Sequence, residues 1–329
     1  MKKTGFATIG TSKITKRFLN AAKECEDFKL VAVYSRDIRK AETFAEEQGA
    51  ERFYDSVDEL AADAEVAAVY VASPNHMHYE HVMKLLKAGK HVICEKAIAS
   101  NYREAEEMIR TAREKNLVLL EAVRPVYDPG MQAVKEGMQK LGAIRRVDIR
   151  YCQYSSRYDS FKEGQEHNIF SRECSAGALM DIGVYCVHVL LDFLGMPEKI
   201  NGFSVMLRGD IDGAGDFLAK YPDKIAGVSY SKITDSALPS EIQGENGMLL
   251  FWGTINSPEN VKIVYRDGSE EMIYQREHLN DMKYELELFL RMICGEEDAD
   301  SHMERSLNAM KLMDEMRRQC GITFPADER

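Results

Sequence analysis

Apolar and polar positions alternate along the first 121 residues with two periods, one typical of strands and one typical of helices. Short apolar runs predict strands at residues 5–10, 30–34, 52–54, 67–71, 91–94 and 117–120. Apolar positions three or four apart predict helices at residues 14–25, 38–48, 57–62, around 82–86, and 102–115. Strands separated by helices predict an α/β fold with a parallel, doubly wound sheet.

The pattern changes from residue 122 onward. Strand-like runs are expected at residues 144–154, 199–207, 225–233, 240–244, 247–252 and 261–265, and helices at 129–141, 177–194, 279–294 and 302–320. Turn sequences such as Asp267-Gly268 indicate antiparallel pairing. We therefore predict a Rossmann domain at residues 1–121 and an α+β domain at 122–329, built on a large open sheet. The last helix is a candidate to pack back on the first domain.

Composition narrows the class of protein. The 329 residues carry a net charge of −11, which does not suit the basic face of a nucleic-acid-binding protein. No apolar run approaches the roughly 20 residues of a membrane helix, and the first residues do not resemble a secretory signal. The seven cysteines are scattered without a Cys-x-x-Cys pair, so we expect a cytoplasmic protein without a zinc site. An exposed sheet face in the second domain would favour a homodimer or homotetramer.

The turn after the first strand is where a dinucleotide fingerprint belongs. Only Gly10 matches the three-glycine pattern, because Ser12 and Thr15 replace the other two glycines. A plain strand-to-helix turn explains the run equally well. Small side chains and a helix N-terminus nevertheless suit a pyrophosphate. The candidate coenzyme-binding residues of this turn are Gly10, Thr11, Ser12, Lys13 and Ile14.

The end of the second strand bears on the choice of coenzyme. NAD sites usually carry an acidic residue there, whereas this chain has Ser35-Arg36, with Lys40 one turn further on. Asp37 is expected to cap the following helix. A guanidinium and a hydroxyl suit a 2′-phosphate, so we favour NADP over NAD. The alternative is that Arg36 is simply a solvated surface charge.

Two further segments carry candidate chemistry. A strand at residues 91–94 delivers Glu95-Lys96 to its carboxyl end, where ligands of open parallel sheets bind. In the second domain, Asp181, Tyr185 and His188 share one face of a predicted helix. A free phenol ionises only near about pH 10, and a lysine cation within a few ångströms favours the phenolate. Buried hydrogen bonds to the backbone are the structural alternative for this face.

Three motifs resemble the glucose–fructose oxidoreductase/inositol dehydrogenase (Gfo/Idh/MocA) family. They are Ser-Pro-Asn-x-x-His at 73–78, Gly-Lys-His-Val-x-x-Glu-Lys at 89–96, and Gly-x-Leu-x-Asp-x-Gly-x-Tyr at 177–185. The tyrosine of the last motif resembles the glucose–fructose oxidoreductase and dimeric dihydrodiol dehydrogenase branch. The resemblance implies a nicotinamide-dependent oxidoreductase with Lys96, Asp181 and Tyr185 in the catalytic site. It also assigns to coenzyme binding Ser73, Pro74, Asn75, His78, Glu95, Lys96 and Arg124.

The chain departs from the family pattern at several positions. Ala97 replaces the usual proline after Glu-Lys, which is expected to remove a rigid, often cis, turn. The arginine expected at position 126 is a valine, although Arg124 is near. His76, His78 and His81 lack the carboxylates or cysteines of a metal site, so no metal is predicted. The candidate substrate-binding residues are Lys96, Tyr127, Arg172, Asp181, Tyr185 and His188.

The predicted activity is hydride transfer between a nicotinamide and a carbinol or carbonyl carbon of a sugar, polyol or related diol. Tyr185 acts as the acid/base and Lys96 assists it. Two alternatives stay open: a catalytically silent protein that senses NAD(P), and an enzyme whose tightly bound nicotinamide is recycled in the site.

Overall fold

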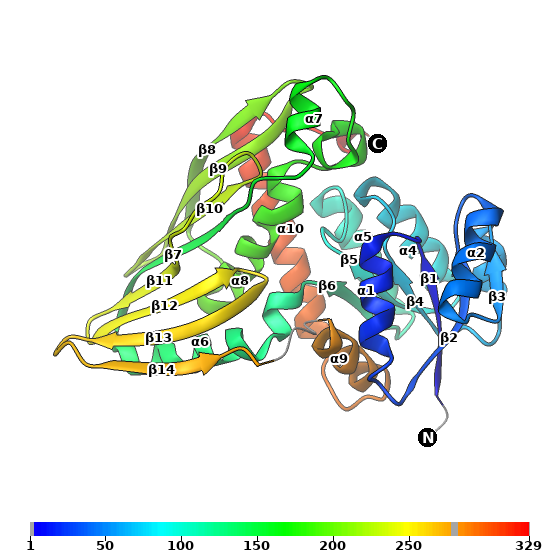
Figure 1. Ribbon diagram of the computed structural model, residues 1–329, viewed down its shortest axis with the longest axis horizontal. Helices are drawn as coiled ribbons and strands as arrows, with labels where there is room; N and C mark the ends of the chain where they lie inside the picture. The colour runs from blue at the N-terminus through cyan, green and yellow to red at the C-terminus, as the bar shows by residue number, and fades with distance from the viewer. Residues whose placement is uncertain (1–2, 278–281, 329) are drawn as a thin grey trace. The chain divides into compact units, whose positions relative to one another are not determined.

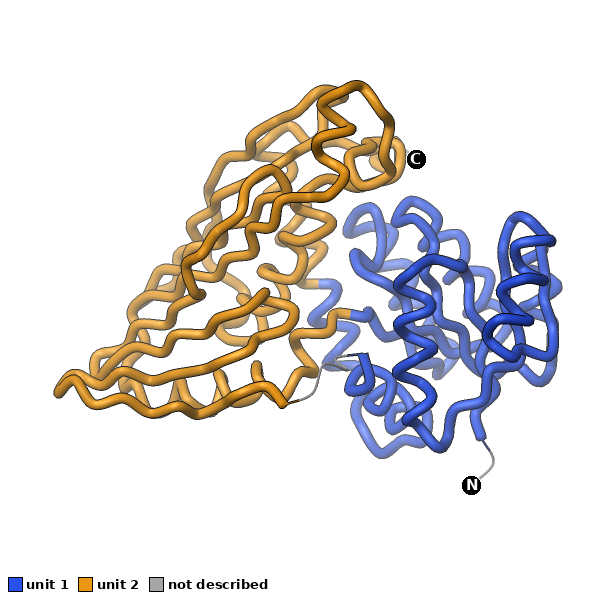
Figure 2. The backbone as a smooth tube through the Cα atoms, viewed as in Figure 1, with its two compact units in different colours: residues 1–122, 280–307 blue, residues 123–279, 308–329 orange. Residues whose placement is uncertain are grey.

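The chain folds into two compact units, and each is described by itself (Figure 2). The computed structural model describes residues 3–277 and 282–328. Unit 1 comprises Met1–Ala122 and Asn280–Leu307, and unit 2 comprises Val123–Leu279 and Asn308–Arg329. Residues 280–307 thus group with unit 1, whereas the sequence analysis placed them in the second domain. Leu279, the first residue of one predicted helix, lies outside the described residues.

Unit 1 is a doubly wound α/β unit around a parallel sheet of order β3-β2-β1-β4-β5-β6 (Figure 1). The strand order reverses between β1 and β4, which is where nucleotides bind in such sheets. Its strands are β1 Thr4–Ile9, β2 Phe28–Tyr34, β3 Arg52–Tyr54, β4 Ala68–Val71, β5 His91–Glu95 and β6 Leu119–Ala122. Its helices are α1 Lys13–Ala22, α2 Ile38–Gln48, α3 Val57–Ala62, η1 Asn75–Met77, α4 His78–Lys87, α5 Tyr102–Glu114, α9 Lys283–Ile293 and the first part of α10 Asp300–Cys320.

Aromatic packing connects the core of unit 1 to the carboxyl end of its sheet. The rings of Phe18 on α1 and Tyr70 on β4 stack with their centroids 3.8 Å apart. The Tyr70 hydroxyl donates a 2.6 Å hydrogen bond to the Glu95 carboxylate at the end of β5. This packing fixes α1, β4 and the end of β5 against one another, and these are the elements that carry the candidate site.

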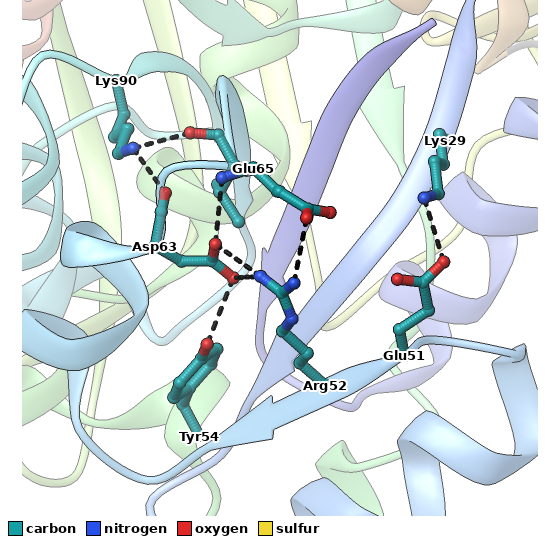
Figure 3. A network of polar contacts seen from close by, with 8 residues as sticks. Lys29, Glu51, Arg52, Tyr54, Asp63, Glu65 and Lys90 are labelled. Atoms are coloured by element: carbon teal, nitrogen blue, oxygen red, sulfur yellow. Dashed lines mark hydrogen bonds and ion pairs between the residues drawn. The ribbon is translucent and has the colours of Figure 1, made fainter.

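A polar network connects β3 with the segments that precede β4 and β5 (Figure 3). Arg52 of β3 donates to both oxygens of Asp63 at 2.6 and 2.7 Å, and Tyr54 donates to the same carboxylate at 3.1 Å. Lys90, just before β5, donates to the carbonyls of Asp63 and Val66, each at 2.7 Å. Burial raises the pKa of Asp63, but the hydrogen bonds from Arg52 and its neighbours more than offset this and hold it below its ordinary value. The network precedes β4 and β5, so it stabilises the sheet and does not form part of the candidate site.

Unit 2 is built on an eight-stranded sheet of order β14-β13-β12-β11-β7-β10-β9-β8. Neighbouring strands are antiparallel except for the parallel pair β7 and β10. The sequence analysis missed two of these strands, β9 and β14. The strands are β7 Ile144–Cys152, β8 Lys199–Leu207, β9 Ile211–Lys220, β10 Ile225–Ser231, β11 Ser240–Gly244, β12 Gly247–Thr254, β13 Ser257–Tyr265 and β14 Glu270–Gln275.

Helices of unit 2 pack against this sheet, with α6 near β12–β14 and α8 near β7 and β10 (Figure 1). The segment Arg172–Leu194 is long and apolar enough to cross a membrane by length and composition alone, but 89% of its most apolar window is buried, as in a core helix. The helical elements are η2 Arg124–Tyr127, α6 Pro129–Met138, η3 Gln139–Leu141, α7 Tyr158–Lys162, η4 Asn168–Phe170, η5 Arg172–Cys174, the π-helical turn η6 Leu179–Gly183, α8 Val184–Leu194, the later part of α10, and η7 Pro325–Glu328.

The sheet of unit 2 leaves apolar side chains in solvent, as the sequence analysis expected. Phe203 on β8 and Leu218 on β9 are 86% and 59% exposed. The register pairs Phe203 with Asp216 and Leu218 with Gly227, which places both apolar side chains on the same face. A groove of about 1220 Å³ runs over this face and is bordered by the later part of α10.

Candidate active site

The turn between β1 and α1 requires glycine at its first position. Gly10 has a φ of +109°, and a Cβ there would lie 2.7 Å from the carbonyl oxygen of Ala72. Ser12 is the N-cap of α1, and its side chain makes no capping hydrogen bond. A close backbone approach and a helix N-terminus without a side-chain cap suit a pyrophosphate. Thr11 and Ile14 are half-buried, whereas Ser12 and Lys13 are exposed.

Exposed cationic side chains follow β2, and the Asp37 carboxylate beside them is hydrogen-bonded to the backbone of α2. Asp37 accepts hydrogen bonds from the backbone N–H groups of Arg39 and Lys40, at 3.1 and 3.4 Å. The prediction that Asp37 caps α2 is therefore confirmed. Arg36 and Lys40 are exposed, and the Ser35 hydroxyl accepts a 3.3 Å hydrogen bond from the Asp37 amide. An exposed guanidinium beside a carboxylate that already caps a helix favours a 2′-phosphate over an unmodified ribose.

His78 connects the two turns that follow β4 and β5. Its ring is fully buried, with Nδ1 2.9 Å from the Ala97 carbonyl and Nε2 2.8 Å from the Ser73 carbonyl. Burial lowers the pKa of His78, although the two backbone contacts oppose this. His78 thus holds the turn at Ser73 to the turn at Ala97, and its contact with the coenzyme stays a prediction. Ser73, Pro74 and Asn75 of the first turn are half-buried.

Two charged neighbours at the end of β5, Glu95 and Lys96, differ in their exposure. The Glu95 side chain is buried and bonded to Tyr70, so it belongs to the frame of the site rather than to its surface. Lys96 is half-buried and follows directly. The Lys96–Ala97 peptide bond is cis, so the expectation that Ala97 removes a cis turn is wrong. The backbone N–H of Ile98 donates to Glu121 on β6 at 2.9 Å, which fixes the segment after Lys96.

In unit 2, a buried carboxylate holds the start of the helix with the third motif. The Asp212 Oδ2 atom accepts a 2.7 Å hydrogen bond from the Leu179 amide. Gly177, with a φ of +104°, makes room for this carboxylate, because a Cβ there would lie 2.1 Å from Asp212 Oδ1. Burial raises the pKa of Asp212 to about 7. Gly183 brings the same helix onto β10, where a Cβ would lie 3.0 Å from the Tyr230 ring.

This helix presents the predicted acid/base residue beside a cation of the same unit. The Arg124 Nη2 atom donates a 3.3 Å hydrogen bond to the Tyr185 hydroxyl, and the guanidinium lies 5.8 Å from the ring centroid. Arg124 is 8% exposed and Tyr185 is 4% exposed. The hydrogen bond places a buried positive charge beside the oxygen of the predicted acid/base residue. The sequence analysis assigned Arg124 to the coenzyme and expected Lys96 alone to fill this role.

Asp181 is also paired with a cation, which the sequence analysis missed. The Lys232 ammonium forms an ion pair with Asp181 Oδ2. Lys232 follows directly after β10, just as Lys96 follows directly after β5. The position of Lys232 at the end of a strand could have marked it as a candidate site residue. Its pairing with Asp181 could not be predicted, because 51 positions separate the two residues in sequence.

The other predicted substrate residues differ in their surroundings. His188 is 1% exposed, which makes it a weaker candidate for substrate contact than Asp181, whose side chain is 26% exposed. Arg172 donates a 2.7 Å hydrogen bond to the Thr323 carbonyl, so it anchors its loop to the last segment of the chain. Tyr127 is half-buried in the same short helix as Arg124. That Lys96 of unit 1 meets Tyr185 of unit 2 stays a prediction.

Comparisons with known proteins agree with this fold. Residues 4–123 match the model of the oxidoreductase family with an NAD-binding Rossmann fold, and residues 131–250 match the GFO/IDH/MocA C-terminal domain. The chain is 42% identical over 325 residues to scyllo-inositol 2-dehydrogenase (NADP(+)) IolU of Bacillus subtilis, covering 98% of this chain and 99% of that protein.

Other similar proteins are more distant. Trans-1,2-dihydrobenzene-1,2-diol dehydrogenase of Mus musculus is 28% identical, with 92% of each chain covered. Among solved structures, KijD10, a 3-ketoreductase from Actinomadura kijaniata in complex with NADP and TDP-benzene, superimposes with a TM-score of 0.85 at 24% identity. That likeness covers 97% of this chain and 98% of the other, and it shows the shared fold.

Proposed function

This chain belongs to the GFO/IDH/MocA family of oxidoreductases, and from that premise we propose that it is an NADP-dependent dehydrogenase or reductase of polyols, sugars or related diols. The observation that carries the proposal is the Tyr185 hydroxyl, which accepts a hydrogen bond from the buried Arg124 guanidinium. A phenol supported in this way is suited to proton exchange with a substrate hydroxyl.

Each residue of the proposed site has its own role in the reaction. In the oxidative direction, the Tyr185 phenolate takes the proton of the substrate hydroxyl and becomes the neutral phenol. Arg124 and Lys96 stabilise the negative charge on the phenolate before the transfer and on the substrate oxygen as the proton leaves. Asp181 orients the substrate by accepting a hydrogen bond from one of its hydroxyls. When bound, the nicotinamide would supply the hydride acceptor for oxidation of the carbinol carbon, or the hydride donor in the reverse direction. His78 keeps the turns that carry Ser73 and Lys96 together.

NADP is the proposed coenzyme. The Gly10 turn has the close approach that a pyrophosphate needs, and the exposed Arg36 lies beside a carboxylate already used as a helix cap. The relative at 42% identity carries NADP(+) in its name. A polyol is the proposed substrate class because that relative acts on scyllo-inositol and the 28% relative on a dihydrodiol, both of which carry neighbouring carbinol groups.

Absorbance at 340 nm with NADP⁺ and a panel of inositols, aldoses and diols tests the activity. On the best substrate, Tyr185→Phe and Lys96→Met should each lower kcat by at least about 100-fold. Tyr265→Phe and Lys140→Met are matched controls, because both residues bond Glu271 at the rim of the unit 2 sheet. Normal turnover by either site variant would reject the assignment of that residue. Coenzyme binding by the wild type without any turnover would favour the alternative of a catalytically silent protein that senses NAD(P).

The exposed sheet face of unit 2 supports a homodimer or homotetramer in which a second copy covers Phe203 and Leu218. Light scattering of the purified protein tests this. Phe203→Glu should reduce the mass toward that of one chain, and a wild-type mass of 37.4 kDa would contradict the proposal.

A further inference from the structure

Lys232 is a charged side chain of unit 2 that the mechanism above does not use. It is 8% exposed, and its ammonium pairs with the Asp181 carboxylate, also of unit 2. A lysine is almost never buried without a partner, so this ion pair explains why the ammonium is tolerated there. The question is whether the pair only stabilises the fold or also sets the position of Asp181.

The backbone at Lys232 is fixed on both sides. Its N–H donates a 2.8 Å hydrogen bond to the Gly213 carbonyl, and its carbonyl accepts a 2.9 Å hydrogen bond from the Ser155 N–H. The Ser231 hydroxyl accepts hydrogen bonds from the N–H groups of Ile233 and Thr234, at 3.2 and 3.0 Å, which closes the turn after β10. The Lys232 side chain therefore starts from a backbone held by β9 and by the segment after β7.

The backbone at Asp181 is fixed from the other direction. Its N–H donates to the Gly177 carbonyl at 3.0 Å, and the same helical turn is held at Leu179 by Asp212. Gly183 brings the turn into contact with the Tyr230 ring of β10, the strand that ends at Lys232. Both partners of the ion pair are thus anchored to β9 and β10, and only their side chains remain to be ordered.

We propose that Lys232 is a positioning residue that holds the Asp181 carboxylate oriented toward the substrate hydroxyl. The two proposed catalytic side chains of unit 2 then each contact a cation of the same unit, Arg124 for Tyr185 and Lys232 for Asp181. Removing Lys232 takes away the ammonium of this ion pair, and a partly buried carboxylate that loses such a contact turns toward water. This inference rests on the proposed function where it assigns Asp181 to the substrate.

A double-mutant cycle tests the coupling. Lys232→Met should lower kcat/KM for the polyol by about 10–100-fold, the scale expected for a misplaced catalytic group, with the Kd for NADPH within about 2-fold of wild type. Lys232→Arg should recover most of the loss. In an Asp181→Asn background, Lys232→Met should change kcat/KM by less than about 2-fold. Lys135→Met removes another lysine–carboxylate pair, with Asp192 on α8, and should have no kinetic effect.

The inference would be overturned if the losses in kcat/KM of Lys232→Met and Asp181→Asn multiplied in the double variant. It would also be overturned if Lys232→Met kept the wild-type kcat/KM. A crystal structure of Lys232→Met supplies a readout that needs no turnover: the Asp181 carboxylate should leave its wild-type position, and an unmoved carboxylate overturns the inference. If Lys232→Met does not fold, Lys232→Gln replaces it in both measurements. Failure of the wild type to turn over any substrate would count against the proposed function, and the crystal structure would still decide the role of Lys232.

Discussion

The buried carboxylate of Asp212 makes a quantitative prediction about stability. Its pKa is raised to about 7 by burial, against an ordinary value of 3.8. Between these two values the folded state binds more protons than the unfolded state, so the free energy of unfolding falls as pH rises from about 4 to 7. At about 1.4 kcal/mol per pH unit, the fall attributable to this group is on the order of 4 kcal/mol.

Asp212→Asn should remove this dependence, because an amide oxygen still accepts the hydrogen bond from the Leu179 N–H but does not ionise. The difference in unfolding free energy between the variant and wild type should therefore grow in favour of the variant by about 4 kcal/mol between pH 4 and pH 8. Urea unfolding at each pH measures it. Trp252 is the single tryptophan of the chain and lies on β12, so its fluorescence reports on unit 2.

Asp210→Asn, which removes an exposed carboxylate two residues earlier, controls for the loss of one negative charge. A difference between Asp212→Asn and wild type that stays constant from pH 4 to pH 8 would refute the reasoning. It would mean that the folded state already holds Asp212 in the same protonation state as the unfolded chain across this range.

Three further substitutions test the site. Gly10→Ala should raise the Kd for NADPH at least about 10-fold in a fluorescence titration, since the new Cβ would meet the Ala72 carbonyl; unchanged binding would mean that this turn does not approach the coenzyme. Arg36→Ala should raise KM for NADP⁺ at least about 10-fold and leave KM for NAD⁺ nearly unchanged, and equal effects on both would rule out contact with a 2′-phosphate. Arg124→Met should lower kcat at least about 10-fold with little change in KM for NADP⁺, because its hydrogen bond is to Tyr185; the opposite split would return Arg124 to the coenzyme site.

Much of unit 1 could be predicted from sequence because each of its elements is encoded locally. Apolar runs mark buried parallel strands, Asp37 marks the start of α2, and Gly49 marks its end with a φ of +74°. The same local signals identified the glycine turn at Gly10 and the lysine at the end of β5. These features depend on residues only a few positions apart.

Strand β9 was missed for a physical reason. Gly213 and Gly215 interrupt the alternation of apolar and polar positions that marks a strand. The structure explains Gly215, because a Cβ there would lie 2.3 Å from the Tyr230 hydroxyl on β10. Strand β14 is a six-residue strand at the end of the sheet and carries two adjacent glutamates. Its pairing with β13 therefore depends on the rest of the sheet more than on its own pattern.

The cations of the site illustrate a second limit. Arg124 and Tyr185 are 61 positions apart, and Lys232 and Asp181 are 51 apart. No periodicity connects residues at such distances, so their pairing follows only from the topology of unit 2. Sequence reasoning identified Tyr185 and Asp181 but not these two partners, because a motif names residues but not their neighbours in space.

The way the chain is shared between its two units limits how it can be divided. It passes from unit 1 to unit 2 after Ala122, returns after Leu279 and leaves again after Leu307, so neither unit is a single stretch of sequence. A fragment that stops at position 279 would lack α9 and all of α10, and would damage both halves at once. Chimeras that exchange the nucleotide half between relatives must therefore carry residues 280–307 with it.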